Sequence, residues 1–375
     1  MTFDTAHTLL DRFPIIDGHN DLAWALREAG AGDPARTDIS LPVNFTHTDL
    51  PRLAKGRVGA QFWSVYVPAQ LAGEAAVTAT LEQIDLVYRL AAQFPGALQL
   101  AFSAADILRI IDSGRVASLL GAEGGHSIAE SLGVLRAFYL LGVRYLTLTH
   151  NLSLPWADSA TDEPVAGGLS AFGRDVVQEM QRLGMLVDLS HAAPTTMHDA
   201  LATAAAPVIF SHSSTFTVCD HPRNVPDEIL ARLASNGGLC MITFVPAFVA
   251  QHCRDWELEL ATEMDRQGLD YRDLSQRKRF KGTWLAAHPR PTATIADVVA
   301  HLEHAREVAG VDHIGLGGDY DGVDELPVGL EDVSCYPALF EALLARRWSE
   351  SECGKLANGN ILRVMRDAET AAGVS

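Results

Sequence analysis

The chain has few cysteines, and none of them form a CxxC pair. Five cysteines are spread over 375 residues. An odd number without close pairs argues against a disulfide framework and against a zinc site built from thiolates. We expect reduced, packed thiols, as in a cytoplasmic protein. The cysteines are Cys219, Cys240, Cys253, Cys335 and Cys353.

Long apolar runs and positive charge are also scarce. No segment reaches 18 uninterrupted apolar residues, so we expect no transmembrane helix. The first residues, "MTFDTAHTLLDRF", carry acidic side chains early, which favours a short amphipathic helix over a signal peptide. The formal net charge of −18 argues against nucleic acid and against an anionic membrane as a partner. These absences predict a soluble globular protein with a cytoplasmic location.

Apolar runs of strand length alternate with helical patterns along most of the chain. The helical patterns cover residues 73–94, 103–114, 168–184 and 292–310. Near-continuous apolar runs are typical of strands that are buried on both faces. Eight of them alternating with helices predict an α/β fold of the (β/α)8 TIM barrel type, with a doubly wound open sheet as the alternative. The runs are residues 14–19, 59–67, 116–124, 143–150, 185–191, 207–213, 238–244 and 313–319.

One connection in this pattern is long. Residues 245–291 carry mixed charge and the basic cluster "RKRFK". We interpret them as a helical excursion on the rim of the barrel, serving as a lid or a subunit contact, or as a solvated insertion. No linker or low-complexity tract interrupts the rest, so we expect a single barrel domain over residues 1–375.

Six of the eight apolar runs end in an imidazole or a carboxylate. In a (β/α)8 barrel the chemistry lies at the C-terminal ends of the strands. One histidine at a strand end is more often structural, but repetition at six ends predicts that these side chains converge on one mouth. Residues i and i+2 of a strand face the same side, so His19 and Asp21 can reach one metal ion. The other residues at these ends are Glu123, His150, His191, His212 and Asp319, with Asp321 as the rival of Asp319.

Imidazoles and carboxylates suit zinc as ligands, with manganese or cobalt as alternatives. Ligands from four strands are too many for one open catalytic ion, so we expect two Zn²⁺ ions that share a bridging group. Glu123 is the best-placed bridging carboxylate. A carbamylated lysine is the other usual bridge, but none of the four lysines ends a predicted strand: they are Lys55, Lys278, Lys281 and Lys355.

Seven ordered motifs resemble those of the membrane (renal) dipeptidase family of the amidohydrolase superfamily. They are "IIDGHNDLAWAL", "GAEGGHSI", "LTHN", "DLSHA", "SHSS", "HPRNVPD" and "GLGGDYDGV", and the resemblance runs from about residue 14 to residue 365. It implies a (β/α)8 barrel with a binuclear zinc site and a soluble bacterial-type member, with a homodimer as the expected assembly. One zinc ion would take His19, Asp21 and Glu123, and the other would take Glu123, His191 and His212.

The resemblance also implies roles for three residues around the metals. His150 would face the scissile carbonyl oxygen, Arg223 would bind the C-terminal carboxylate of the substrate, and Asp319 would meet the free amino group and transfer protons. A structural pairing of Arg223 with Asp227 is the alternative. With Glu123, His150 and Asp319 in catalytic roles, we expect a dipeptidase in which a metal-bridging hydroxide attacks the peptide bond of a dipeptide.

Two other functions stay open at this point. The first is a related binuclear amidohydrolase acting on another amide, a lactam or an N-acyl amino acid. The second is a barrel that binds or scaffolds without catalysis. Among the remaining candidates, Trp24 and Tyr66 could line the pocket, but we interpret them as ordinary core or rim aromatics. We interpret His301 and His304 as solvated. We read Asp17 and Asp188 as carboxylates that orient metal ligands.

Overall fold

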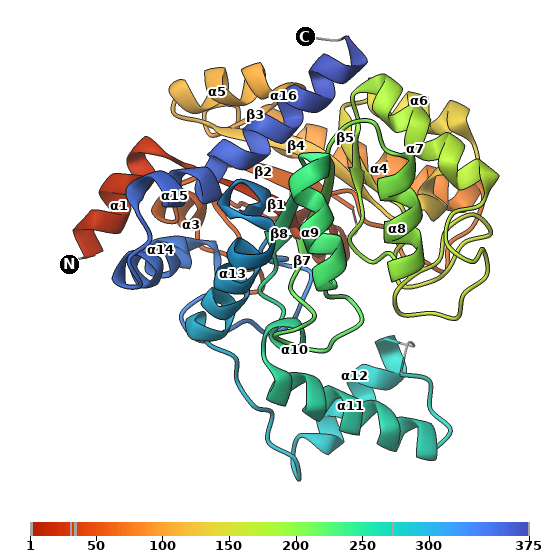
Figure 1. Ribbon diagram of the computed structural model, residues 1–375. Coiled ribbons are helices and arrows are strands. Elements are labelled where there is room, and N and C mark those ends of the chain that lie inside the picture. Colours follow the sequence, from red (N-terminus) through yellow and green to blue (C-terminus); the bar gives the residue numbers. More distant parts are fainter. Residues whose placement is uncertain (1–2, 31, 34–35, 272–273, 374–375) are drawn as a thin grey trace.

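Eight parallel strands close into a barrel in the computed structural model, which describes residues 3–30, 32–33, 36–271 and 274–373 (Figure 1). The order around the barrel is β1-β2-β4-β5-β6-β7-β8-β9, and the pairing of β9 with β1 closes it. The predicted (β/α)8 TIM barrel is therefore confirmed, and the open sheet is excluded. The strands are β1 (Ile15–Asn20), β2 (Val58–Ser64), β4 (Val116–Glu123), β5 (Val143–Thr147), β6 (Leu186–Asp188), β7 (Val208–Ser213), β8 (Leu239–Ile242) and β9 (Ile314–Leu316).

A further strand, β3 (Leu98–Leu100), lies outside the closed barrel. It pairs in parallel with Val116–Ser118 at the start of β4. From Leu120 onward, the same edge of β4 pairs with β5 instead. The sequence reading missed it, because three residues reading "LQL" are too short to show a strand pattern.

Helices surround the barrel, and the predicted ones are present. They are α1 (Phe3–Arg12), α4 (Glu74–Gln93), α5 (Ala104–Asp112), α7 (Ala171–Leu183) and α13 (Ile295–Ala309). Ser103 caps α5 through its side chain, and Gly184 ends α7 in the left-handed conformation. No helix among the described residues is long and apolar enough to cross a membrane. The others on the barrel are α2 (Leu22–Gly30), α3 (Leu50–Lys55), α6 (Leu132–Leu140), α8 (Pro194–Thr203), α9 (Asp227–Asn236), α14 (Tyr336–Ala345), α15 (Glu350–Gly354) and α16 (Asn360–Ala372).

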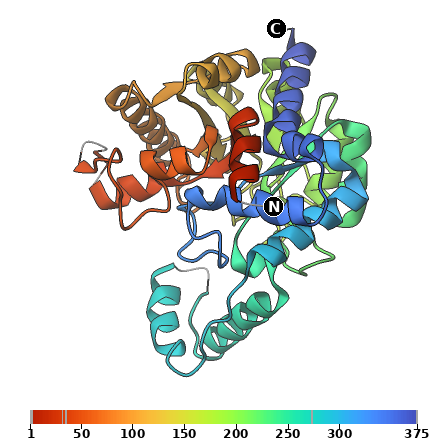
Figure 2. The same ribbon diagram turned by 90° about the vertical axis from the view of Figure 1, so that its left-hand side faces the viewer.

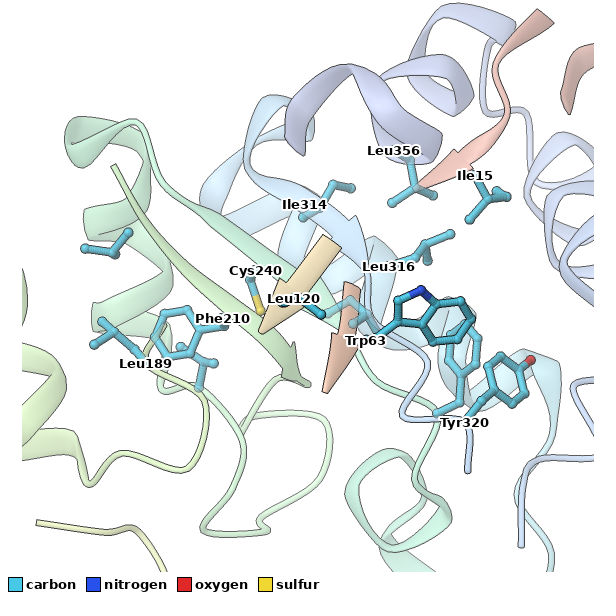
Figure 3. Packing of buried hydrophobic residues seen from close by; sticks show 14 of the residues in the cluster. Ile15, Trp63, Leu120, Leu189, Phe210, Cys240, Ile314, Leu316, Tyr320 and Leu356 are labelled. Carbon is cyan, nitrogen blue, oxygen red and sulfur yellow. The ribbon is translucent and has the colours of Figure 1, made fainter. Parts of the chain in front are cut away.

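The strands divide their side chains between two apolar cores. Along β7, Val208 and Phe210 pack outward against the helices, whereas Ile209 joins a second cluster that also contains Leu239 and Met241 of β8. Figure 3 shows the outer cluster, with Phe210, Cys240 and Leu316 among its members. The alternation follows from the period of two in a strand. It matters for function because the inward positions near the C-terminal ends point into the barrel mouth.

The segment predicted as an excursion is helical and projects away from the barrel (Figure 2). It contains α10 (Pro246–Val249), α11 (Gln251–Arg266) and α12 (Leu274–Trp284). Helices α11 and α12 share a small apolar cluster that is separate from the two barrel cores and is centred on Trp256, Leu260 and Met264. Beyond Cys253 the excursion therefore packs largely on itself, whereas Val249, Ala250 and Cys253 join the outer core of the barrel.

His301 lies at the base of this excursion, and the expectation that it is solvated is wrong. Its side chain is fully buried on α13. Nδ1 accepts the backbone N–H of Thr215 at 3.0 Å, and Nε2 lies 3.1 Å from the carbonyl oxygen of Val249 in α10. His304, one turn further along α13, is partly buried and pairs with Asp227 at 2.8 Å. The two histidines of this i, i+3 pair thus contact segments that pack against α13 instead of solvent.

Candidate metal centre

Glu123 continues the inward-facing series of strand β4. Ala117 and Leu119 belong to the inner core, and Gly121 and Glu123 follow at the same period of two. Gly121 is required at its position, because a Cβ there would collide with the ring of Tyr145 from the neighbouring strand β5. Tyr145 can therefore cross the barrel interior beneath Glu123, which leaves the Glu123 carboxylate at the top of the packed core.

The two oxygens of Glu123 face two different groups of ligand-type side chains. Oε2 lies 3.4 Å from His19 Nε2, which itself is 3.2 Å from Asp21 Oδ2. Oε1 lies 3.0 Å from His191 Nε2 and 3.5 Å from His212 Nε2. The five residues predicted as metal ligands are thus brought together, with Glu123 between the other four. One carboxylate oxygen toward each group is the arrangement that a bridging ligand needs.

The Nδ1 atom of each of the three predicted ligand histidines contacts a side chain outside the centre. In His19 this nitrogen lies 2.8 Å from the hydroxyl of Tyr145, which donates to the carbonyl of Gly18. In His212 it lies 2.8 Å from the hydroxyl of Ser211. In His191 it lies 3.1 Å from the amide oxygen of Asn151. Since each of these partners accepts, Nδ1 carries a proton in all three rings. In His191 and His212, which burial keeps neutral, Nε2 therefore presents a lone pair to the centre. The pKa of His19 is instead raised well above its usual range, because Tyr145, Glu123 and Asp21 outweigh the opposing effect of burial.

This protonation pattern leaves acceptors facing acceptors. The Nε2 atoms of His191 and His212 lie 3.1 Å apart, and each faces a carboxylate oxygen of Glu123. His19 Nε2 and Asp21 Oδ1 are buried without a hydrogen-bond partner. Lone pairs crowded in this way repel one another unless a cation lies between them, and neutral imidazoles with carboxylates are ligands of divalent transition metals. The residues present therefore fit a metal centre.

Burial acts on the protonation of the same groups. It lowers the pKa of His150, His191 and His212 well below the usual range, so these imidazoles are neutral at pH 7. It raises the pKa of Glu123. Neutral imidazole is the form that binds a metal ion, so the low histidine pKa values favour metal binding.

Asp319 and His191 adopt backbone conformations that side chains other than glycine rarely take. Their φ angles are +61° and +67°. Both residues come three positions after the end of their strand, β9 or β6, so the strained turn brings each side chain back over the mouth. Strain of this kind is kept where the surrounding structure demands it, and it is frequent at functional sites.

Asp319 stands at the edge of the metal-ligand cluster, whereas Asp321 does not. Asp319 Oδ1 lies 3.9 Å from His19 Nε2, and burial raises the Asp319 pKa well above its usual value. Asp321 instead accepts the backbone N–H of His47, and its own N–H donates to His47 Nδ1 at 3.0 Å. Of the two aspartates in "GGDYD", the geometry therefore favours Asp319 as the one that can meet a substrate.

Arg223 is a buried cation that lacks an anionic partner among the described residues. Its side chain bonds only weakly, to Ser213 Oγ at 3.4 Å and to the carbonyl oxygen of His212 at 3.3 Å, and it stacks over the ring of Phe248. Burial lowers its pKa to about 10. The alternative pairing with Asp227 is absent, because Asp227 pairs with His304. A desolvated guanidinium of this kind is suited to an anionic ligand.

His150 and two aromatic side chains form one wall of the mouth. His150 Nε2 lies 3.7 Å from Glu123 Oε1, and the ring of Tyr66 is centred 5.1 Å from the His150 ring. Trp24 packs edge-on against Tyr66 with ring centres 5.0 Å apart. Both aromatics are partly exposed. Their place beside His150 agrees with the alternative that they line the pocket, and not with the preferred reading as ordinary core or rim aromatics.

The residues that hold the imidazoles were mostly invisible in the sequence. Asn151 and Ser211 lie inside the motifs "LTHN" and "SHSS", and Tyr145 lies five residues before His150, but nothing in the sequence marks them as partners of the imidazoles. Asp17 was predicted as an orienting carboxylate, and it accepts the backbone N–H groups of His19 at 2.8 Å and Gly318 at 3.2 Å. It thereby ties the turn that carries Asp319 to strand β1.

Comparison with known proteins shows the family of this chain. A family model described as membrane dipeptidase, peptidase family M19, matches residues 3–375. The chain belongs to the membrane dipeptidase family. It is accordingly a hydrolase of peptide bonds from a metallopeptidase family.

Dipeptidases of mammals and of a yeast are similar to it in sequence. Dipeptidase 3 of Homo sapiens is 42% identical over 371 residues, which cover 97% of this chain and 67% of that protein. An uncharacterized dipeptidase of Schizosaccharomyces pombe is 43% identical over 378 residues, which cover 97% of this chain and 83% of that protein. The chain therefore spans about two thirds of the length of the mammalian relatives.

Two solved structures of bacterial peptidases share the fold. The probable dipeptidase PvdM from Pseudomonas aeruginosa superposes with a TM-score of 0.86 at 21% identity, over 99% of each chain. A metallopeptidase from Rhodobacter sphaeroides, liganded with a phosphinate mimic of the dipeptide L-Ala-D-Ala, gives a TM-score of 0.79 at 23% identity. It covers 95% of this chain and 99% of that one.

Proposed function

We propose that the chain is a zinc-dependent dipeptidase with two metal ions at the mouth of the barrel. His19, Asp21 and Glu123 would hold one ion, and Glu123, His191 and His212 the other. The observation that carries the proposal is the Glu123 carboxylate, which turns one oxygen to His19 and the other to the His191–His212 pair. When bound, the two zinc ions supply Lewis acidity and a hydroxide nucleophile at neutral pH.

The chain's own residues would bind and orient the dipeptide. Arg223, buried without an ion-pair partner among the described residues, would take the C-terminal carboxylate through a bidentate contact. His150 would donate a hydrogen bond to the oxyanion that develops on the scissile carbonyl. Burial lowers its pKa and keeps it neutral, and a neutral imidazole still carries one N–H that can donate.

Asp319 is suited to the proton transfers. It lies beside His19 Nε2, and its raised pKa allows it to hold a proton near neutral pH. We assign to it the proton released by the nucleophile, which it would then pass to the leaving amine. In its charged form it would also pair with the free amino group of the substrate. Because one group binds the C-terminal carboxylate and another binds the free amino group, the distance between them selects the length of the substrate. A dipeptide therefore fits better than a longer peptide.

The relative from Rhodobacter sphaeroides was solved with a mimic of L-Ala-D-Ala, which supports a dipeptide as the substrate class. The test compares a dipeptide with its N-acetylated form after the protein is loaded with zinc. We expect hydrolysis of the free dipeptide and at least about tenfold slower hydrolysis of the acetylated one, since the charge-assisted contact to Asp319 is lost. Equal rates would favour the amidohydrolase that acts on N-acyl amino acids. The cytoplasmic location and the homodimer stay predictions from the sequence.

A further inference from the structure

Asp188, at the end of strand β6, is a fully buried carboxylate without a cationic partner among the described residues. Four donors surround it. Oδ1 accepts the backbone N–H groups of Ser190 at 3.1 Å and Ser211 at 2.8 Å. Oδ2 accepts the hydroxyls of Ser211 and Thr147. A carboxylate with only donors around it remains an acceptor, and its negative charge lies just outside the metal centre.

The Ser211 hydroxyl connects this charge to a metal ligand. Ser211 Oγ donates to Asp188 Oδ2 at 2.6 Å and lies 2.8 Å from His212 Nδ1. Since the one hydroxyl proton points to Asp188, Oγ must accept from the His212 ring. The relay from Asp188 through Ser211 therefore places the proton of His212 on Nδ1 and the lone pair on Nε2, toward the centre.

The other two imidazoles are held by neutral groups. Tyr145 holds His19 and Asn151 holds His191. The two halves of the centre also differ in charge. The His19 side has Asp21 besides the shared Glu123, whereas the side of His191 and His212 has the shared Glu123 alone. Asp188 is placed to supply the charge that the second half lacks.

We propose that Asp188, acting through the Ser211 hydroxyl, is a positioning residue that sets the affinity of the ion on the His191–His212 side. The inference rests on the metal centre of the proposed function. An acceptor hydrogen-bonded to the remote nitrogen of a histidine fixes its tautomer and raises its basicity toward the metal. Loss of the relay should weaken this ion and leave the one at His19 and Asp21 in place.

The chain offers a matched pair of variants for the test. Ser211→Ala breaks the link to His212, whereas Thr147→Val removes the other hydroxyl from the same Asp188 oxygen and leaves the link intact. Both are small changes at buried positions. Each protein is equilibrated with zinc buffered by a competing chelator, and the bound zinc per chain is measured by mass spectrometry across the titration. We expect two ions in the wild type and in Thr147→Val. In Ser211→Ala we expect one of them about 10- to 100-fold weaker.

A nitrogen-15 spectrum of the metal-free proteins reads the His212 tautomer directly and does not depend on activity. We expect the Nδ1–H form in the wild type and in Thr147→Val, and a mixture of tautomers in Ser211→Ala. Wild-type affinity for both ions in Ser211→Ala would overturn the inference. Equal weakening of both ions in the two variants would also overturn it, since that result indicates general loosening. A wild type that binds no zinc and cleaves no dipeptide would instead remove the proposed function.

Discussion

The barrel mouth and the excursion of helices α10–α12 differ in how their buried polar and charged groups are partnered. In the excursion, apolar side chains cluster on one another, and Arg290 is neutralised by Glu257 at 3.1 Å and by Glu325. In the mouth, buried acceptors face acceptors, and Arg223 has no ion pair among the described residues. A region whose buried polar and charged groups all have partners serves structure, whereas a region that leaves such groups without partners is suited to bind a ligand.

The largest expected effect comes from Glu123→Gln. The amide keeps the shape but cannot offer a charged oxygen to each side, so we expect loss of bound zinc and a fall in kcat/KM of at least about 10³-fold. The amide N–H₂ can donate to an imidazole Nε2, so the metal-free variant should unfold at a higher temperature than the metal-free wild type. Zinc content, steady-state kinetics and thermal unfolding measure the three effects.

Glu257→Gln in the excursion is the control, since it neutralises a half-buried carboxylate that lies beside Arg290. It should keep both the zinc and the activity. A Glu123→Gln enzyme that retains two ions and full activity would contradict the bridging role of Glu123 and erase the contrast between the two regions.

The second effect compares two stacked arginines. Arg223 lies over Phe248 and Arg290 over Trp256, with 5.3 and 5.6 Å to the ring centres. For Arg223→Ala we expect KM for a dipeptide to rise about 10- to 100-fold, because a charge-assisted contact to the substrate carboxylate is lost. Arg290→Ala should leave KM within about twofold, because that guanidinium already has two carboxylates.

A dipeptide amide, which lacks the C-terminal carboxylate, separates recognition from folding. The wild type should handle the amide about as poorly as Arg223→Ala handles the free dipeptide, and the substitution should have little further effect on the amide. If Arg223→Ala weakens both substrates equally, Arg223 serves structure and not carboxylate binding.

The sequence predicted the barrel and the residues that gather at its mouth, because both depend on local patterns. Buried parallel strands appear as apolar runs, and residues such as Glu123 and His212 stand at their ends. The convergence of these ends follows from barrel closure. The short strand β3 was not predicted, because its pairing with β4 depends on the geometry of the chain and not on a sequence pattern of its own.

The supporting contacts could not be predicted, because they join residues distant in sequence. Tyr145 reaches His19 across 126 positions only because Gly121 makes room for its ring. His301 looked like a solvent-facing helix residue, and its burial depends on Thr215 and on Val249 at the base of the excursion. A period of 3.6 shows which residues share a face but not what that face meets.

A third test uses the pH dependence of stability at the junction of the two regions. Burial lowers the His301 pKa from 6.5 to about 4, so the unfolded state binds this proton more readily than the folded state. Stability contributed by neutral His301 is therefore complete above about pH 6.5 and is lost as pH falls toward 4. The loss approaches about 3 kcal/mol at the acid end of this window.

His301→Asn retains an acceptor for the backbone N–H of Thr215, but the amide does not take up a proton between pH 6.5 and pH 4. We expect the denaturant-derived stability of this variant to fall less steeply than that of the wild type between pH 6.5 and pH 4. The difference between the two profiles isolates His301 from the other buried histidines. Parallel profiles would show that His301 takes up its proton equally in both states.

The smallest expected effect on activity comes from Trp256→Ala, which removes the centre of the excursion's cluster. Trp256 contributes buried apolar surface and a hydrogen bond from Nε1 to the carbonyl oxygen of His288 at 3.1 Å. Emptying such a site costs about 3 to 5 kcal/mol, so α11 should exchange its amide hydrogens faster while the barrel strands do not. Because the excursion packs mainly on itself, kcat/KM should stay within about threefold. A loss of activity in step with the faster exchange would instead make the excursion a lid, since only a segment that closes over substrate would couple its own opening to turnover.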